Sequence, residues 1–280
     1  MITDTDCTAD CDERGRGPAV LLVPGSCSTG AAWRAVQTHL DERFNCVTTS
    51  LPGYGGVAER RPEADPSIAH VAEGIETVAS AVTGPIHLVG HSFGGLVALA
   101  VAVRRKVPLA SLTMIEPPAV TILTRDTSDT IHLQAFDRLR NEYAHAFSTG
   151  EPEAIGKMVD FYGGHGTFAL WPERARQYAV ETTEVNLRDW QSAYGFDLTP
   201  ATLAAMNCST LVIRGGKSHP AMQRVTMRLA EYIAGARLVT VEAAAHFMIT
   251  THAADVATII ARHVDTSQDR LSVCVRATAC

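Results

Sequence analysis

The chain contains no hydrophobic run that approaches the roughly 20 apolar residues needed to cross a bilayer. Its opening residues, Met1 to Asp6, are acidic and lack the apolar core of a secretory signal. Lysine and arginine number 24 against 30 aspartates and glutamates, so the formal net charge is −6. That balance disfavours nucleic acid and anionic membranes as partners. These absences predict a cytoplasmic protein that binds neither nucleic acid nor membrane.

Motifs for a bound cofactor are also missing. The chain has no glycine-rich phosphate loop, no dinucleotide fingerprint and no cluster of metal-ligand residues, so we expect neither a cofactor nor a metal. Its seven cysteines are odd in number and scattered, which indicates reduced thiols rather than a disulfide framework. Cys7 and Cys11 have a C-x3-C spacing, but no second pair completes a zinc site, and we interpret them as incidental.

What the chain does contain is a regular alternation of apolar strands and amphipathic helices. Its 280 residues are enough for one large core. The pattern predicts strands at Ala19–Val23, Cys46–Ser50, Ile86–Val89, Leu109–Ile115, Leu211–Arg214 and Arg237–Val241. It predicts helices at Gly30–Leu40, Ile68–Ala81, Leu96–Arg105, Met222–Ala234 and Ala254–His263. This alternation is typical of a mostly parallel, doubly wound α/β sheet.

Between Ile115 and Thr210 the alternation stops, and most of the large aromatic residues lie there. Helical patterns in this stretch are Ile131–Ala146, Glu153–Phe161 and Glu173–Trp190. A helical insertion between two strands of such a sheet predicts a cap above the carboxyl ends of the strands, where open α/β sheets bind ligands. We expect most of the aromatics to form the cap's own core, with Trp171 and Trp190 as the exceptions that contact substrate.

Ser92 stands between an apolar strand and an apolar helix, in the run Gly90-His91-Ser92-Phe93-Gly94-Gly95. This context matches the G-x-S-x-G nucleophile elbow. The serine of an elbow has a strained backbone, so its close neighbours must lack side chains, and Gly90 and Gly94 occupy those positions. Ser92 is therefore the predicted catalytic nucleophile. The alternative is a glycine-rich turn that merely contains a serine.

Three blocks together resemble the α/β-hydrolase superfamily: Leu21 to Ser26, the turn around Ser92, and Ala245-His246-Phe247 after the last predicted strand. The resemblance covers nearly the whole chain. It implies a hydrolase core at residues 1–116 and 208–264 with a helical cap at 117–207.

The two ends of the chain depart from this simple plan. Few residues precede Gly17, so we expect at least one of the antiparallel strands that usually open the fold to be missing. Residues 265–280 are polar and have no clear period, and we expect a poorly ordered tail.

The resemblance implies that His246 is the general base. It lies in a loop of small residues, Ala243 to Ala245, which leaves the imidazole free to reach Ser92. A neutral imidazole can remove the hydroxyl proton and later return it to the leaving group.

The acid of the triad departs from the usual family pattern. Most relatives have an aspartate after the next strand of the sheet, but Ser218 stands at that place, and residues 200–229 contain no Asp or Glu. Glu116 lies one helix and one strand after Ser92, at the same sheet edge. A subset of the superfamily uses this position, including lactone-opening enzymes similar to those that cleave zearalenone. We therefore predict that the Glu116 carboxylate lies within about 3 Å of Nδ1 of His246 and orients it.

The resemblance further implies an oxyanion hole built from two backbone N–H groups. Phe93, directly after the nucleophile, supplies one, and Ser26, in the loop after the first core strand, supplies the other. Cys27 has no adjacent base in sequence, which disfavours thiol catalysis. We expect Cys27 and His219 to line the substrate pocket.

Three functions fit these residues. The first is a cofactor-free serine hydrolase that cleaves an ester or lactone of a small, neutral or hydrophobic compound through a Ser-His-Glu triad and an acyl-enzyme. The second is a carbon–carbon hydrolase or lyase that uses the same triad, and the third is a ligand receptor with vestigial activity. The complete set of triad residues favours the first.

Overall fold

The computed structural model describes residues 11–278 and contains one seven-stranded sheet in the order β1-β3-β2-β4-β5-β6-β7. Its strands are β1 (Asp12–Arg14), β2 (Ala19–Val23), β3 (Asn45–Thr48), β4 (Ile86–His91), β5 (Leu109–Ile115), β6 (Ser209–Gly215) and β7 (Arg237–Val241). Neighbours among β2 to β7 pair in parallel, and β1 pairs antiparallel with β3. The predicted mostly parallel α/β sheet is thus confirmed, and one antiparallel strand precedes β2 within the described residues. Met1 to Asp6 and Cys7, about which the sequence makes predictions, lie outside those residues.

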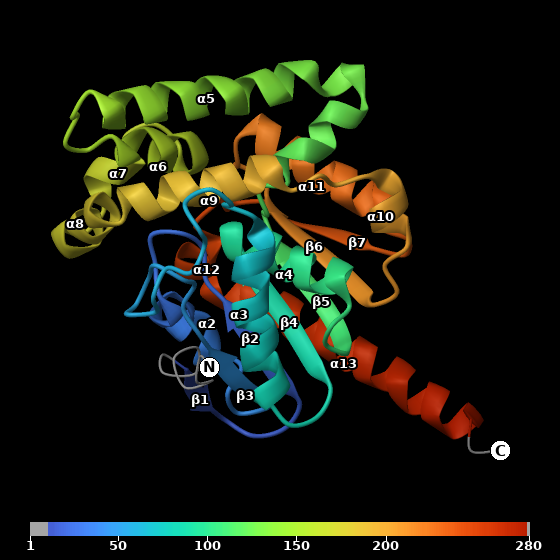
Figure 1. The fold of residues 1–280 in the computed structure, drawn as a ribbon. Coiled ribbons are helices and arrows are strands. Elements are labelled where there is room, and N and C mark those ends of the chain that lie inside the picture. The colour runs from blue at the N-terminus through green and yellow to red at the C-terminus, as the bar shows by residue number, and fades with distance from the viewer. Residues whose placement is uncertain (1–10, 279–280) are drawn as a thin grey trace.

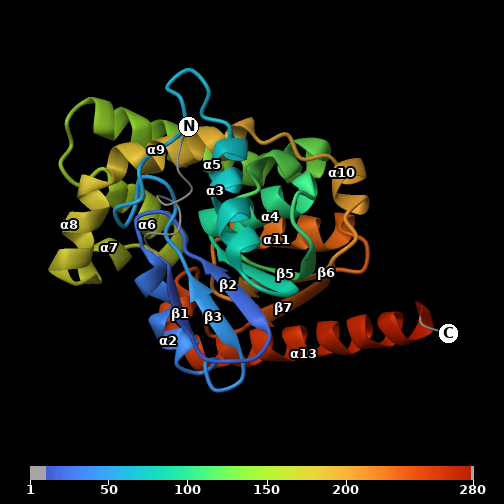
Figure 2. The ribbon, with the colours of Figure 1, turned by 60° about the horizontal axis from the view of Figure 1, so that its bottom comes forward.

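Helices cover both faces of the sheet (Figure 1, Figure 2). On one face lie α3 (Ile68–Ala81), α4 (Phe93–Arg104) and α11 (Pro220–Tyr232). On the other lie η1 (Gly30–Trp33), α2 (Arg34–Gln37), α12 (Met248–Thr251) and α13 (Ala253–Thr278). Successive side chains of β4 point to opposite faces, so Leu88 packs in the first core and Val89 in the second. A strand buried on both faces is mostly apolar, which explains the hydrophobic runs of the sequence; the buried polar residues of β4, His87 and His91, are hydrogen-bonded.

The helical insertion, residues 117–207, joins β5 to β6 and lies above the carboxyl ends of the strands (Figure 1). Its helices are η2 (Val120–Arg125), η3 (Thr127–Asp129), α5 (Thr130–Ser148), α6 (Ile155–Gly163), α7 (Thr167–Leu170), α8 (Glu173–Glu181), α9 (Thr183–Gly195) and α10 (Pro200–Ala204). On α5, Phe136, Leu139 and Tyr143 recur at helical spacing and are all buried. The insertion therefore has an apolar interior of its own.

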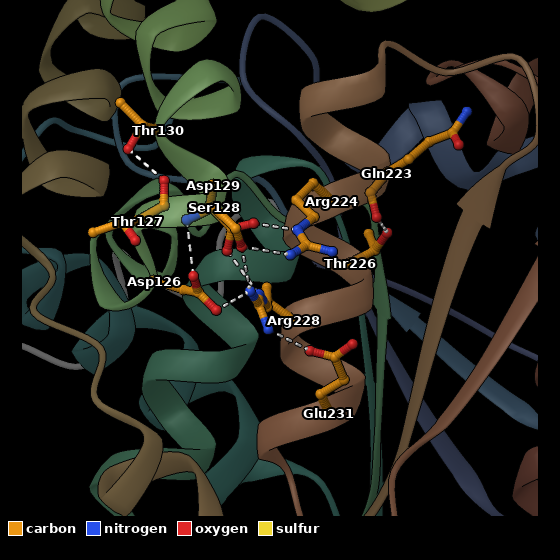
Figure 3. Close-up of polar contacts among 10 residues, drawn as sticks. All are labelled: Asp126, Thr127, Ser128, Asp129, Thr130, Gln223, Arg224, Thr226, Arg228 and Glu231. Atoms are coloured by element: carbon orange, nitrogen blue, oxygen red, sulfur yellow. Dashed lines mark hydrogen bonds and ion pairs between the residues drawn. The ribbon is translucent and has the colours of Figure 1, made fainter.

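An ionic cluster fastens the start of the insertion to α11 (Figure 3). Asp129 is fully buried and accepts hydrogen bonds from Arg224 and from Nε of Arg228, the latter at 2.6 Å. Arg228 also donates to Asp126 and, at 3.0 Å, to Glu231. We call these five residues the Asp129 cluster.

The carboxyl-terminal helix is longer than the sequence pattern predicts. The helix expected at Ala254–His263 continues as α13 to Thr278. Its continuation is tied to the core, because Asp265 pairs with Arg43 at 2.9 Å and Gln268 hydrogen-bonds His87 at 2.7 Å. Beyond these contacts α13 projects away from the body of the molecule (Figure 2). In the described part of the chain, no helix combines the length and apolarity that a membrane span requires.

Candidate active site

Ser92 occupies the single-residue corner between β4 and α4. Its backbone angles, φ 53° and ψ −127°, are rare for a residue with a side chain. The corner is tight: a Cβ on Gly90 would lie 2.3 Å from the carbonyl oxygen of Gly94, and one on Gly94 would lie 2.1 Å from that of Pro24. These positions therefore require glycine, as the elbow pattern predicts, and the turn exposes the serine hydroxyl at the edge of the sheet.

His246 connects Ser92 to Glu116. Its Nε2 lies 3.0 Å from Ser92 Oγ, and its Nδ1 lies 2.7 Å from Glu116 Oε2. The other carboxylate oxygen of Glu116 accepts a hydrogen bond from the Gly215 amide at 2.7 Å, which ties the acid to the end of β6. With Nδ1–H donating to the carboxylate, Nε2 is left to accept from the serine hydroxyl. The structure thus brings together the three residues to which the sequence assigns the triad.

Ser218, at the place of the usual acid, does not take part in this chain of contacts. Its hydroxyl is buried and has no hydrogen-bond partner among the described residues. At the nearby end of β6, the Gly215 amide donates a hydrogen bond to Glu116 instead.

Two aromatic rings hold the imidazole of His246. Tyr162, from α6 of the insertion, stacks on it with ring centres 4.4 Å apart. His91 lies 4.9 Å away, and its Nε2 donates to the His246 carbonyl oxygen at 2.9 Å. Burial lowers the pKa of His91 to about 3, against a smaller raising effect of that hydrogen bond, so the ring is neutral at pH 7. His91 is therefore a packing residue beneath the site rather than a second base.

The two predicted oxyanion donors, Ser26 and Phe93, line the cavity that Ser92 and His246 also line. Phe93 begins α4, and the first amides of a helix have no carbonyl of their own helix to bond. Ser26 follows Gly25, where a Cβ would lie only 3.0 Å from the Cβ of Ser92, so this loop closely approaches the nucleophile.

A buried carboxylate that the sequence analysis missed holds the Ser26 loop. Asp189, on α9, accepts hydrogen bonds from Ser26 Oγ at 2.6 Å, from the Tyr54 hydroxyl at 2.6 Å and from Arg61 Nη1 at 2.8 Å. Burial raises the pKa of Asp189 to about 6, and the guanidinium and the two hydroxyls oppose that rise. The only signal in the sequence was an acid beside Trp190 in a helix with a buried face. The interaction links the insertion to the oxyanion loop.

The cavity has a volume of about 460 Å³ and contains the reactive ends of Ser92 and His246. Of the predicted substrate contacts, Cys27, Trp171 and Trp190 line it. Burial raises the pKa of the Cys27 thiol to about 12, which keeps it protonated and unreactive.

The placement of His219 differs from the prediction, because this residue does not line the cavity. Its ring stacks on Phe161 with centres 4.0 Å apart, and its Nδ1 accepts the Ala221 amide as the cap of α11. Pro220 begins that helix directly after it, so the imidazole serves to complete the helix end.

Comparison with known proteins identifies the family of this chain and solved structures with the same fold. A family model described as the alpha/beta hydrolase family matches residues 20–259. A thermophilic esterase from Thermogutta terrifontis superposes with a TM-score of 0.69 at 22% identity, covering 92% of this chain and 93% of that one. This superposition shows that the two proteins share a fold.

Two curated relatives match shorter segments. An uncharacterized protein of Mycobacterium tuberculosis is 36% identical over 86 residues, which is 30% of this chain and 25% of that protein. A pimeloyl-[acyl-carrier protein] methyl ester esterase of Methylococcus capsulatus is 38% identical over 101 residues, 36% of this chain and 37% of the esterase. The matched region is thus well under half of each relative's length.

Proposed function

Since this chain belongs to the alpha/beta hydrolase family, we propose that it is a serine hydrolase that cleaves a carboxylic ester or lactone of a small, neutral or hydrophobic compound. The observation that carries the proposal is the continuous chain of hydrogen bonds from Ser92 through His246 to Glu116, which ends at a cavity. A serine, a base and an orienting acid in this order are the parts that acyl transfer requires.

In the proposed reaction, Ser92 Oγ attacks the substrate carbonyl carbon while His246 Nε2 takes the hydroxyl proton. The negative charge of the tetrahedral intermediate falls on the former carbonyl oxygen, which the amides of Ser26 and Phe93 stabilise. Glu116 remains ionised and stabilises the imidazolium. His246 then protonates the leaving alcohol, and water, deprotonated by the same imidazole, hydrolyses the acyl-enzyme.

The cavity wall supports an apolar substrate. Aromatic and aliphatic side chains such as Met158, Trp171 and Trp190 make up most of it. In this proposal the helical insertion is a cap that excludes water, and the esterase among the relatives favours ester chemistry. Preference for a lactone rests on the acid position, Glu116, which is similar to that of zearalenone-cleaving enzymes. We place the protein in the cytoplasm, acting on a small molecule.

Labelling with a fluorophosphonate probe, together with a panel of p-nitrophenyl esters and lactones, tests the proposal. Wild type should be labelled and should hydrolyse at least one ester or lactone. Ser92→Ala should lose labelling, with kcat lower by a factor on the order of 10⁶. His246→Ala should be folded but unlabelled at neutral pH, because the hydroxyl has lost its base.

Residual turnover by Ser92→Ala above about a thousandth of wild type would refute the assignment of the nucleophile. If wild type binds lactones but takes up no label, the protein is a ligand receptor. If it cleaves only carbon–carbon bonds, it is a carbon–carbon hydrolase or lyase that uses the same triad.

A further inference from the structure

The cavity wall carries a buried polar group that this mechanism does not use. Asn186, on α9, is 2% exposed and lines the cavity. Its Oδ1 accepts a hydrogen bond from the Tyr143 hydroxyl at 3.0 Å. Its amide nitrogen has no partner within residues 11–278. This nitrogen is not among the fully buried side-chain atoms that lack a partner, so it keeps an accessible face although the residue as a whole is buried. The cavity that Asn186 lines is where a ligand can supply the missing partner.

Several other polar groups on the wall are already occupied. Asp189 accepts from three donors, Ser28 donates to the Gly25 carbonyl oxygen at 2.8 Å, and His91 donates to that of His246. The Tyr162 hydroxyl is also unpaired within the described residues, but its ring lies on the imidazole of the base. Among the described residues of the wall, the amide of Asn186 and the indole N–H of Trp190, both on α9, are thus unpaired donors that lie apart from the reacting groups.

The helix sets the place of this donor. Asn186 and Asp189 are three residues apart on α9, so they share a face and are displaced by about 4.5 Å along the axis. Asp189 contacts Ser26 at the oxyanion loop. Asn186 thus lies one helical turn along α9 from the residue that contacts the Ser26 loop, on the same face of the helix.

We propose that Asn186 determines specificity by donating a hydrogen bond from Nδ2 to a second oxygen of the substrate. The substrate class is a hydrophobic ester or lactone with a carbonyl, ether or hydroxyl oxygen a few bonds from the scissile carbonyl. This inference rests on the proposed function, since it assumes that the carbonyl sits at Ser92. Apolar neighbours such as Val120 and Ala193 offer that oxygen no side-chain donor.

The test uses p-nitrophenyl octanoate and a series of p-nitrophenyl oxo-octanoates in which the ketone moves one carbon at a time along the chain. Wild type should hydrolyse one of the ketones with a kcat/KM about three- to tenfold above that of octanoate. This ratio corresponds to the free energy of one buried hydrogen bond. Asn186→Leu should abolish this preference and still hydrolyse octanoate. Asn186→Asp, which keeps the shape and changes the donor to an acceptor when ionised, should also lose it.

Tyr162→Phe is the matched control, because it removes another unpaired donor of the wall and keeps the ring stacked on His246. The ketone preference should persist in this variant. A preference lost in Tyr162→Phe but kept in Asn186→Leu would overturn the proposal, as would a wild type that hydrolyses octanoate through Ser92 with no ketone preferred. If wild type hydrolyses none of the esters and takes up no fluorophosphonate, the proposed function itself fails.

Discussion

Backbone strain in this protein is concentrated at single residues of the site. Within residues 11–278, four residues other than glycine have positive φ angles, and three of them are Cys27, Ser92 and Glu116. The fourth, Arg105, ends α4 in the left-handed conformation that helix ends commonly adopt. Each strained residue costs on the order of 1–3 kcal/mol, which the surrounding fold must supply. In these conformations Ser92 and Glu116 both contact His246, and Cys27 lies on the cavity wall.

Glu116→Gln tests the role of the acid. The amide keeps the shape of the carboxylate but can present N–H to Nδ1 of His246, which favours the wrong tautomer. We expect kcat to fall by roughly three to four orders of magnitude with little change in KM. Steady-state kinetics on the best ester measure this. Ser218→Ala is the control, because the Ser218 hydroxyl has no partner among the described residues. Its removal should leave kcat near that of wild type. An equal fall of kcat in both variants would contradict the assignment of Glu116.

Asp189→Asn tests the link between the insertion and the oxyanion loop. The change leaves the guanidinium of Arg61 buried opposite a neutral group, and breaking a buried ion pair in this way costs about 3 kcal/mol. We expect a loss of stability of that size in urea unfolding, together with a lower kcat because the Ser26 loop loses a charged acceptor. Glu59→Gln, at the more exposed partner of Arg61, should cost less. The reverse order would show that Asp189 is not the main counter-charge.

At the scale of whole elements, the insertion is held to the core at two separate places. The Asp129 cluster joins η3 to α11, and Asp189 joins α9 to loops that follow β2 and β3. Both are ionic contacts between segments far apart in the sequence. The helices of the insertion are therefore positioned relative to the sheet by charge pairs as well as by apolar packing.

Asp129→Ala is predicted to loosen the first of these contacts. It leaves Arg224 and Arg228 without the buried acceptor that they share, at a cost of about 3 kcal/mol. Urea unfolding measures the loss, and hydrogen exchange should show faster opening of η3 and of the first turn of α5. Asp126→Ala removes a more exposed partner of Arg228, together with the side-chain cap of η3, and should cost less than Asp129→Ala. A small effect of both variants would mean that packing alone holds this end of the insertion.

At the scale of the whole molecule, a buried neutral histidine makes stability depend on pH. Burial lowers the pKa of His87 to about 4, with a smaller lowering by His263. Its Nδ1 pairs with Ser111 and its Nε2 with Gln268 on α13, an arrangement that suits the neutral ring. Between about pH 6.5 and pH 4 the unfolded chain therefore binds a proton that the folded protein does not, and stability falls as the pH falls.

His87→Gln removes this titration. The free energy of unfolding of wild type should decrease toward acid more steeply than that of the variant, by at most about 1.4 kcal/mol per pH unit. Urea titrations at several pH values between 4 and 7 measure the two slopes. His91, whose pKa is also lowered by burial, contributes the same trend to both proteins. Parallel slopes would show that His87 is not responsible.

Much of the sheet and of the elbow can be predicted from the sequence because the reasons are local. Period and apolar runs determine the strands, and a turn as tight as that of Ser92 admits only glycine at positions 90 and 94. The order of the chain then brings Glu116 to the same edge of the sheet, since one helix and one parallel strand return it there. The hydrogen bond that His246 Nδ1 donates to Glu116 follows from this placement.

Other features depend on contacts that no local pattern contains. Asp189 is a buried anchor rather than a surface acid because folding brings Arg61 and Tyr54 to it. The His219 side chain caps the start of α11 instead of lining the cavity. The helix α13 continues beyond residue 263, where Asp265 pairs with Arg43 and Gln268 hydrogen-bonds His87. The sequence by itself determined the sheet, the elbow and the chemical types of the site. Tertiary structure alone decided which polar side chains face the cavity, since their burial and pairing depend on segments that meet only in the folded state.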